Sequence, residues 1–211
     1  MIIFDLDGTL LDTSIDLHNA LNYALKAHNL SQKTKQETLS YLGNGIDILV
    51  AKALENGKQN KDYPAVFNTF KTYYEQHLND YTAPYKDIIE LLTILKNKNY
   101  KLGIISNKFD EAVQELHQKF FQNLIDQSLG TSATISKKPS PDGIKLLIQQ
   151  QNAINENNIF IGDSEIDIQT AHNANIPCIS VSWGFRDREF LKSHNAIQII
   201  DTPLDLLKIL E

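Results

Sequence analysis

Short runs of consecutive apolar residues alternate with amphipathic segments over most of the chain. The first run is Met1–Phe4, and similar runs recur after residue 84. Runs that lack polar alternation are typical of strands buried on both faces, as in a parallel sheet covered by helices. The pattern therefore predicts an α/β fold with a parallel sheet. Strands are expected at 1–4, 101–105, 128–129, 158–161, 178–181 and 196–200, and helices at 87–97, 111–119, 141–150 and 165–175.

Residues 14–82 have a different pattern. Apolar residues such as Leu17, Leu21 and Leu25 recur there at helical spacing, and no strand signal interrupts them. The simplest organisation is an α/β core made of residues 1–13 and 83–211, with an all-helical insert over 14–82.

Composition excludes several classes of function. The chain has a net charge of −6 and only two arginines, Arg186 and Arg188, so we expect no nucleic-acid partner. The single cysteine, Cys178, excludes an internal disulfide and a multi-cysteine zinc site. No apolar run approaches the ~20 residues that span a bilayer, and no basic segment precedes an apolar stretch at the N-terminus. We therefore expect a cytoplasmic protein without a membrane partner.

The strongest chemical signal is the segment Phe4-Asp-Leu-Asp-Gly-Thr-Leu10. Asp5 and Asp7 follow a buried strand two residues apart, so their carboxylates face the same space beyond the sheet edge, and Gly8 permits a sharp turn. An acidic surface turn is the alternative. A similar arrangement follows the strand at 158–161, where Asp163 ends the strand and Asp167 lies in the first turn of a helix. Simple capping of that helix is the alternative there.

Two further segments suggest phosphate binding. Ser106 and Asn107 follow a buried strand, and a hydroxyl beside the free N–H groups of a helix start suits a phosphate, although many strand-to-helix turns carry these residues. Lys138 is held extended by Pro139, with Ser140 expected as the N-cap and Pro141 as the first residue of the next helix. An ordinary surface lysine is the alternative for Lys138.

These residues converge if the first strand lies between the strands at 101–105 and 158–161. Ligands of open parallel sheets bind beyond the carboxyl ends of the strands, where Asp5, Ser106 and Asp163 would then meet. Two carboxylates ~5 Å apart repel by about 3 kcal/mol at an effective dielectric constant near 20. Such a cluster needs a cation, and oxygen ligands without cysteine or histidine spacing favour Mg²⁺ over Zn²⁺.

With these four segments in order, the sequence resembles the haloacid dehalogenase-like hydrolases that act on phosphate esters. The resemblance spans the chain and implies a Rossmann-like parallel-sheet core with an inserted all-helical cap of the C1 type. Within the insert, Leu42–Gly45 is similar to the cap loop of phosphoglycolate phosphatases, and Lys138–Asp142 and Trp183-Gly184 also fit that subgroup.

The resemblance implies catalytic roles and a metal site. Asp5 would be the nucleophile that forms an aspartyl-phosphate, and Asp7 the general acid and base. Mg²⁺ would be held by Asp5, Asp163 and the backbone carbonyl of Asp7, with Asp167 as a direct or water-mediated ligand.

The resemblance also implies the substrate contacts. Ser106, Asn107 and Lys138 would hold the phosphoryl oxygens, and Gly43-Asn44-Gly45 would form the substrate loop of the cap. The expected partner is a small phosphorylated metabolite, with 2-phosphoglycolate the best candidate, and the protein would be a monomer or homodimer.

Alternatives remain open at this point. A pyrophosphatase or nucleotidase uses the same motifs. A sugar-phosphate mutase usually needs an arginine in the cap, and residues 14–82 contain none, although they contain seven lysines. A non-catalytic phosphate-accepting module would need neither Asp7 nor Lys138. Arg186 would meet a substrate carboxylate or, as the favoured interpretation, lie on the surface.

Overall fold

The computed structural model describes residues 1–210, which form two compact units. One unit consists of Met1–Asp12 and Pro84–Glu211, and the other of Thr13–Ala83. None of the described helices is both long and apolar enough to cross a membrane.

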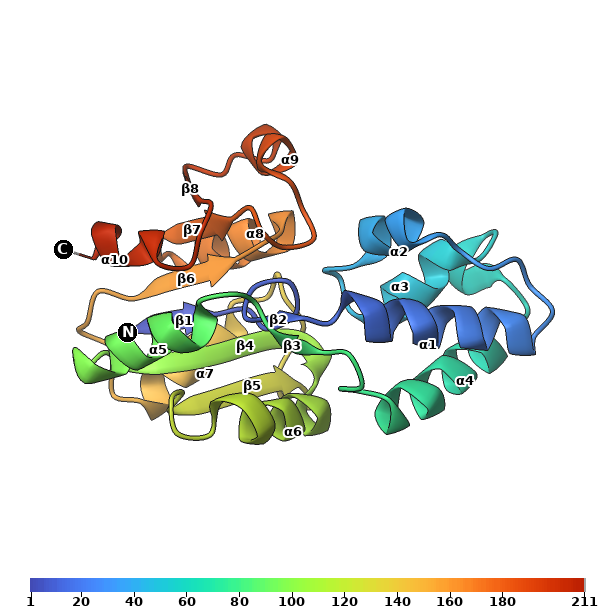
Figure 1. The fold of residues 1–211 in the computed structure, drawn as a ribbon, viewed down its shortest axis with the longest axis horizontal. Coiled ribbons are helices and arrows are strands. Elements are labelled where there is room, and N and C mark those ends of the chain that lie inside the picture. The colour runs from blue at the N-terminus through green and yellow to red at the C-terminus, as the bar shows by residue number, and fades with distance from the viewer. Residues whose placement is uncertain (211) are drawn as a thin grey trace. The chain divides into compact units, whose positions relative to one another are not determined.

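The first unit is built on a six-stranded sheet with the order β5-β4-β1-β6-β7-β8, in which the paired strands run parallel (Figure 1). β1 lies in the middle, because Ile2 is in register with Leu102 on one side and with Ile159 on the other. The predicted α/β class is confirmed, and the condition for the predicted site residues to converge, a first strand between the strands at 101–105 and 158–161, is met. The strands of this sheet are β1 (Ile2–Phe4), β4 (Leu102–Phe109), β5 (Gln127–Thr131), β6 (Ile159–Gly162), β7 (Cys178–Val181) and β8 (Gln198–Ile200).

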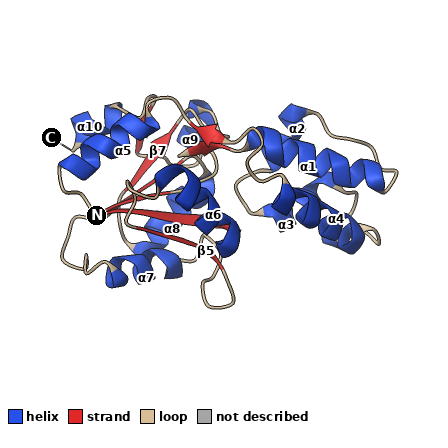
Figure 2. Cartoon of the chain, turned by 60° about the horizontal axis from the view of Figure 1, so that its bottom comes forward, coloured by secondary structure: helices blue, strands red, loops and turns tan. Residues whose placement is uncertain are grey.

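Helices cover both faces of this sheet. In Figure 2, α5 and α10 lie on one side of the strands and α7 on the other. Alternate strand residues face α7 and α8, so Ile3, Ile105 and Phe160 share a buried cluster with Ile144 and Leu147 of α7. The helices of this unit are α5 (Ile88–Asn97), α6 (Asp110–Phe121), α7 (Asp142–Gln150), α8 (Glu165–Ala174), α9 (Arg188–Ser193) and α10 (Asp205–Ile209).

Several local predictions were wrong. β4 continues to Phe109 and α6 begins at Asp110, so Ser106 and Asn107 lie within a strand and not at a helix start. The extension includes a shift of register against β5 between Ile105 and Phe109, which the expected strand at 101–105 did not anticipate.

The start of α7 also differs from the expectation. The helix begins at Asp142, so Pro141 occupies the N-cap position and is not the first helical residue. Ser140 is not the N-cap, although its hydroxyl oxygen accepts a hydrogen bond from the backbone N–H of Asp142 at 3.3 Å. The sequence also gave no signal for α9, α10 or the separate two-stranded sheet of β2 (Leu11–Asp12) and β3 (Ala83–Pro84), because all four elements are six residues or shorter.

The second unit is helical, and no strand lies within residues 14–82. Its core includes Leu21 and Leu25 on the buried stripe of α1 and Val66 and Phe70 on that of α4. Its elements are α1 (Ser14–Ala27), α2 (Lys35–Tyr41), α3 (Ile46–Ala53), the 3₁₀ helix η1 (Gly57–Gln59) and α4 (Tyr63–Gln76).

The turn between α2 and α3 depends on glycine. Gly43 has φ of 101° and Gly45, the N-cap of α3, has φ of 83°. Side chains with a Cβ atom rarely adopt such angles, so both positions favour glycine. The turn thereby presents Asn44 between two glycines.

Asp16 ties the beginning of the helical unit to its end. Its carboxylate is buried and accepts hydrogen bonds from the backbone N–H of Thr82 at 2.8 Å, the hydroxyl of Thr82 at 2.7 Å and the backbone N–H of Tyr81 at 3.1 Å. These bonds connect residues 65 and 66 positions apart in the chain. These charge-assisted hydrogen bonds hold the first helix of the unit next to its last residues.

Replacing Asp16 with Ala should therefore lower the free energy of unfolding by about 2–3 kcal/mol, because it leaves buried donors without an acceptor. Chemical denaturation followed by circular dichroism measures this change. The control is Glu75→Ala, which removes an exposed i,i+4 pair with Lys71 in the same unit and should cost below ~0.5 kcal/mol. Equal effects of the two substitutions would contradict this role of Asp16.

Candidate active site

Three buried carboxylates gather at the carboxyl ends of β1 and β6. Oxygens of Asp5, Asp163 and Asp167 all lie within 4.8 Å of one another. Asp5 follows β1, Asp163 follows β6, and Asp167 lies in the first turn of α8. Among residues 1–210, this is the one cluster of three or more acidic, histidine or cysteine side chains with such spacing.

The sheet register and two glycines bring these carboxylates together. Phe4 is in register with Ile161, and the N–H of Asp5 donates to the carbonyl of Ile161 at 2.8 Å. A Cβ atom at Gly162 would lie 2.3 Å from the Cβ of Asp167, and one at Gly8 would lie 2.4 Å from Oδ2 of Asp163. The close approach of the carboxylates to the backbone therefore requires glycine at both positions.

Lys138 lies between two of the carboxylates. Its Nζ is 2.7 Å from Oδ1 of Asp5 and 2.6 Å from Oδ1 of Asp167, and its side chain is only 3% exposed. Burial lowers the pKa of this ammonium group, but the carboxylates of Asp167 and Asp5 more than offset burial, so the pKa lies above its ordinary value. Lys138 is thus a charged residue of the site and not a surface lysine.

The side chain of Asn107 positions Lys138 through hydrogen bonds to the backbone of Lys138. The side-chain oxygen of Asn107 accepts from the N–H of Lys138 at 2.6 Å, and its amide group donates to the carbonyl of Lys138 at 3.2 Å. The side chain predicted to hold phosphate is therefore engaged with the segment that carries the lysine. Ser106 is buried beside it, and its hydroxyl oxygen accepts from the N–H of Lys108 at 3.2 Å.

Asp163 is held on both oxygens. Oδ1 accepts from the hydroxyl of Thr9 at 3.2 Å, and Oδ2 accepts from the backbone N–H of Phe185 at 2.7 Å. Burial, and next the charge of Asp167, raise the pKa of Asp163 to about 7. Burial likewise raises the pKa of Asp5 well above its ordinary value, against the opposing effect of Lys138. Both shifts arise first from burial, which disfavours the ionised carboxylate, and the neighbouring carboxylates add to the shift.

Asp7 has a partner that sequence reasoning missed. Nζ of Lys108 lies 3.0 Å from Oδ1 of Asp7, and the lysine side chain is 3% exposed. Lys108 lies two residues after Ser106 on β4, and residues two apart on a strand face the same side. The signal was therefore present in the sequence, but only for a strand that continues past residue 105.

The charges of the site sum to a value that a divalent cation would neutralise. When all four are ionised, the carboxylates of Asp5, Asp7, Asp163 and Asp167 face two ammonium groups, those of Lys108 and Lys138, which leaves a charge of −2. Hard oxygen donors of this kind suit Mg²⁺, Mn²⁺ or Ca²⁺. The donor set therefore fits a bound divalent metal.

Arg186 does not lie on the surface, so the favoured interpretation of this residue was wrong. It is 7% exposed, its Nε lies 3.2 Å from a carboxylate oxygen of Glu165, and its guanidinium group lies over the ring of Phe190 at 5.2 Å. A buried arginine balanced by a carboxylate and an aromatic ring stabilises the contact between α8 and α9.

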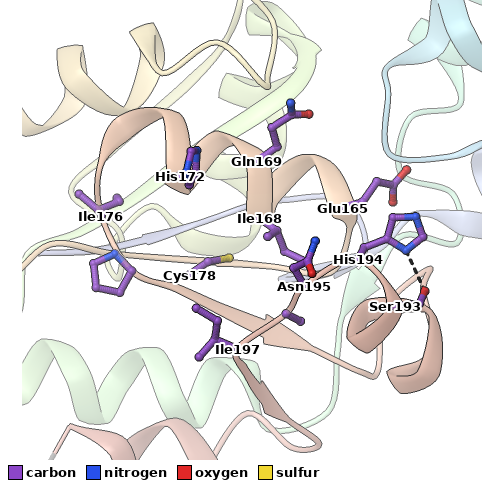
Figure 3. A pocket seen from close by; sticks show the side chains of 12 residues that line it. Glu165, Ile168, Gln169, His172, Ile176, Cys178, Ser193, His194, Asn195 and Ile197 are labelled. Atoms are coloured by element: carbon purple, nitrogen blue, oxygen red, sulfur yellow. Dashed lines mark hydrogen bonds between the residues drawn. The ribbon is translucent and has the colours of Figure 1, made fainter.

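A separate pocket of about 620 Å³ opens beside α8 (Figure 3). Its lining is mainly apolar and includes Ile168, Cys178 and Ile197, and it contains none of the predicted site residues. Burial raises the pKa of the Cys178 thiol to about 12, so this thiol is a poor nucleophile at neutral pH. The chemistry of the molecule therefore concentrates at the carboxylate cluster.

Comparison with known proteins agrees with this geometry. The model of the haloacid dehalogenase-like hydrolase family matches residues 2–181. The chain belongs to this family. It is 30% identical to the phosphoglycolate phosphatase of Haemophilus influenzae, over 100% of this chain and 97% of that protein.

Two further relatives share nearly the whole chain. A pyrophosphatase of Oceanobacillus iheyensis is 28% identical over 99% of this chain and 95% of its own length. A crystal structure from Lactobacillus delbrueckii subsp. bulgaricus, provisionally assigned as a phosphoglycolate phosphatase, is 34% identical with a TM-score of 0.95 over 99% of this chain and 97% of that one. The haloacid dehalogenase-like fold predicted from the motifs is confirmed, and the protein is a phosphatase of this family.

The raised pKa of Asp163 predicts how the stability of the metal-free protein changes with pH. The carboxyl group titrates near 7 when folded and near ~3.9 when unfolded, so the folded state binds more protons between these values. The free energy of unfolding should therefore fall as pH rises from about 4 to 7 and level off above that. Thermal unfolding in the presence of a chelator measures this slope.

Asp163→Asn should reduce the fall in stability over this pH range, because it removes the titrating group. Asp80→Asn is the matched control, since Asp80 is half exposed and pairs only with an exposed histidine, His77. An unchanged slope in Asp163→Asn would contradict the assignment of this titration to Asp163.

Proposed function

We propose that this phosphatase hydrolyses a small phosphorylated metabolite, with 2-phosphoglycolate as the best candidate, through an aspartyl-phosphate on Asp5 and with Mg²⁺ as its metal. The observation that carries the proposal is the pairing of each catalytic aspartate with its own buried lysine. Lys138 lies 2.7 Å from Asp5, and Lys108 lies 3.0 Å from Asp7. A module that only accepted phosphate would not need the second pair.

Asp5 is suited to be the nucleophile. Its Oδ1 accepts from the N–H of Leu6 at 2.7 Å and contacts Nζ of Lys138 at the same distance, which leaves Oδ2 for the attack on phosphorus. In this step a bond forms between Oδ2 and phosphorus while the bond from phosphorus to the leaving oxygen breaks. Lys138 stabilises the negative charge on the transferring phosphoryl oxygens.

Asp7 is the proposed general acid and base. It donates a proton to the leaving oxygen in the first step, and in the second it accepts a proton from the water that attacks the aspartyl-phosphate. The second step releases inorganic phosphate and restores the Asp5 carboxylate. Asp7 lies two residues beyond Asp5, on the loop that follows β1, so both groups act on the same phosphoryl group.

Mg²⁺ would be held by Asp5, Asp163 and the backbone carbonyl of Asp7, with Asp167 beside them. Bound there, it would neutralise charge on the phosphoryl group. Both oxygens of Asp167 are already engaged, Oδ1 with Lys138 at 2.6 Å and Oδ2 with the N–H of Ser164 at 3.0 Å. Because Oδ1 of Asp167 pairs with the ammonium group of Lys138, we propose that Asp167 acts mainly on Lys138 and on the charge of the site.

A pyrophosphatase is the second candidate, because a relative that matches nearly the whole chain carries that name. Pyrophosphate and phosphoglycolate are both small and anionic, and the carboxylate cluster would act on either in the same way. The two substrates differ in the leaving group, which the substrate loop Gly43-Asn44-Gly45 of the helical unit is proposed to select.

The test is the release of inorganic phosphate from a panel of 2-phosphoglycolate, sugar phosphates, nucleotides, pyrophosphate and p-nitrophenyl phosphate. We expect the highest kcat/KM for small phosphorylated acids, loss of turnover after chelation, and recovery with Mg²⁺. A preference for pyrophosphate would select the second candidate.

Asp5→Asn is the control variant for this panel and should abolish turnover and phosphoenzyme formation. Turnover that survives exhaustive chelation would contradict the metal assignment. Phosphorylation of Asp5 without phosphate release would identify a phosphate-accepting module.

The substrate loop gives a separate prediction. Gly45 has φ of 83°, so a larger residue there would strain the backbone whatever its effect on substrate. Asn44→Ala avoids this strain and should change the ratio of kcat/KM values for 2-phosphoglycolate and nucleotides, while leaving the Mg²⁺ dependence unchanged. The control is Asn68→Ala, at an exposed position on α4. An unchanged order of substrates in a folded Asn44→Ala variant would remove this loop from the substrate site.

A further inference from the structure

Lys108 is a buried cation that makes polar contacts through its side-chain ammonium group and through its backbone. Its side chain is 3% exposed, although it extends from β4 at the end of the strand where the carboxylates lie. Lysine is rarely buried to this extent unless its charge is paired. The paired group is Asp7, with 3.0 Å between Nζ and Oδ1.

The backbone of Lys108 is held on both sides. Its N–H donates to the hydroxyl oxygen of Ser106 at 3.2 Å, and its carbonyl accepts from the hydroxyl of Thr131 on β5 at 3.2 Å. These bonds lie where β4 and β5 shift register between Ile105 and Phe109. Irregular pairing of this kind changes the direction in which side chains point at the end of a strand. Here it occurs beside the lysine that contacts Asp7.

The two oxygens of Asp7 have different surroundings. Oδ1, the oxygen near Lys108, is buried and makes no hydrogen bond within residues 1–210, so its contact with Nζ of Lys108 at 3.0 Å is an ion pair only, while 19% of the Asp7 side chain is exposed. The exposed surface therefore belongs to the rest of the side chain, which includes Oδ2. The ion pair therefore holds the carboxylate through the attraction of charges, at the oxygen that lies away from solvent.

We propose that Lys108 is a positioning residue for the proton transfers of Asp7. It binds Oδ1 and thereby directs Oδ2 toward the leaving oxygen and, in the second step, toward the attacking water. This inference rests on the proposed role of Asp7. It assigns different tasks to the two lysines, since Lys138 contacts the nucleophile and Lys108 contacts the acid and base.

The role predicts a loss that depends on the leaving group. In the Mg²⁺-loaded enzyme, Lys108→Met should lower kcat/KM for an alkyl phosphate about 10- to 100-fold, which is part of the ~10²–10⁴ that a general acid contributes. For p-nitrophenyl phosphate, kcat/KM should change less than threefold, because nitrophenolate leaves without a proton. With that substrate kcat should still fall and phosphoenzyme should accumulate, because the attacking water needs a base.

A double-mutant cycle separates this role from direct phosphate binding. If Lys108 acts through Asp7, Lys108→Met should lower the activity of the Asp7→Asn enzyme much less than it lowers wild-type activity. If Lys108 binds the phosphoryl group, both substrates should lose kcat/KM equally, in both backgrounds, and inorganic phosphate should inhibit less strongly. That result would overturn the proposal.

Conservative and distant variants complete the test. Lys108→Arg keeps the charge and should recover part of the alkyl phosphate activity. If Lys108→Met fails to fold, Lys108→Gln, which also removes the charge, replaces it. Lys192→Met, at an exposed lysine paired with Glu189, should leave both substrates unchanged.

The same data distinguish failure of this inference from failure of the proposed function. Full activity in Asp7→Asn would remove Asp7 as the acid and base. A strong loss in Asp7→Asn together with full activity in Lys108→Met would reject Lys108 alone.

Discussion

Repulsion among carboxylates is the constraint on which the rest of the active site depends. Three of them have oxygens within 4.8 Å of one another at one edge of a parallel sheet, where their separation from water strengthens every interaction between them. Neighbouring features reduce this cost. Lys138 bridges Asp5 and Asp167, and the backbone N–H of Phe185 donates to Asp163. The negative charge that remains is one that a divalent cation would neutralise.

The sequence identified the parts of this site that depend on short-range order. Asp5 and Asp163 each follow a buried apolar strand, and the topology of parallel sheets places the ends of adjacent strands together, so the two carboxylates could be expected to meet. That argument required β1 to lie between β4 and β6, which the structure shows. The motifs around Asp5, Ser106, Lys138 and Asp163 also identified the family.

The remaining details depended on contacts between residues far apart in the chain. The extension of β4 to Phe109 depends on its pairing with β5, which no local pattern around Ser106 reveals. Lys108 was overlooked for that reason. The burial of Arg186 likewise depends on Glu165, 21 residues earlier. Asn107 was expected to hold phosphate, but only the fold shows that its side chain bonds to the backbone of Lys138.

The hydrogen bonds of Asp16 have a consequence for how such proteins diversify. Because this carboxylate joins the start of the helical unit to Tyr81 and Thr82, the unit closes on itself through its own residues. An insert with this property can be lengthened, shortened or exchanged between Thr13 and Ala83 without changing the register of the parallel sheet. Substitutions can then accumulate in the helical unit without disturbing the sheet that carries the carboxylate cluster.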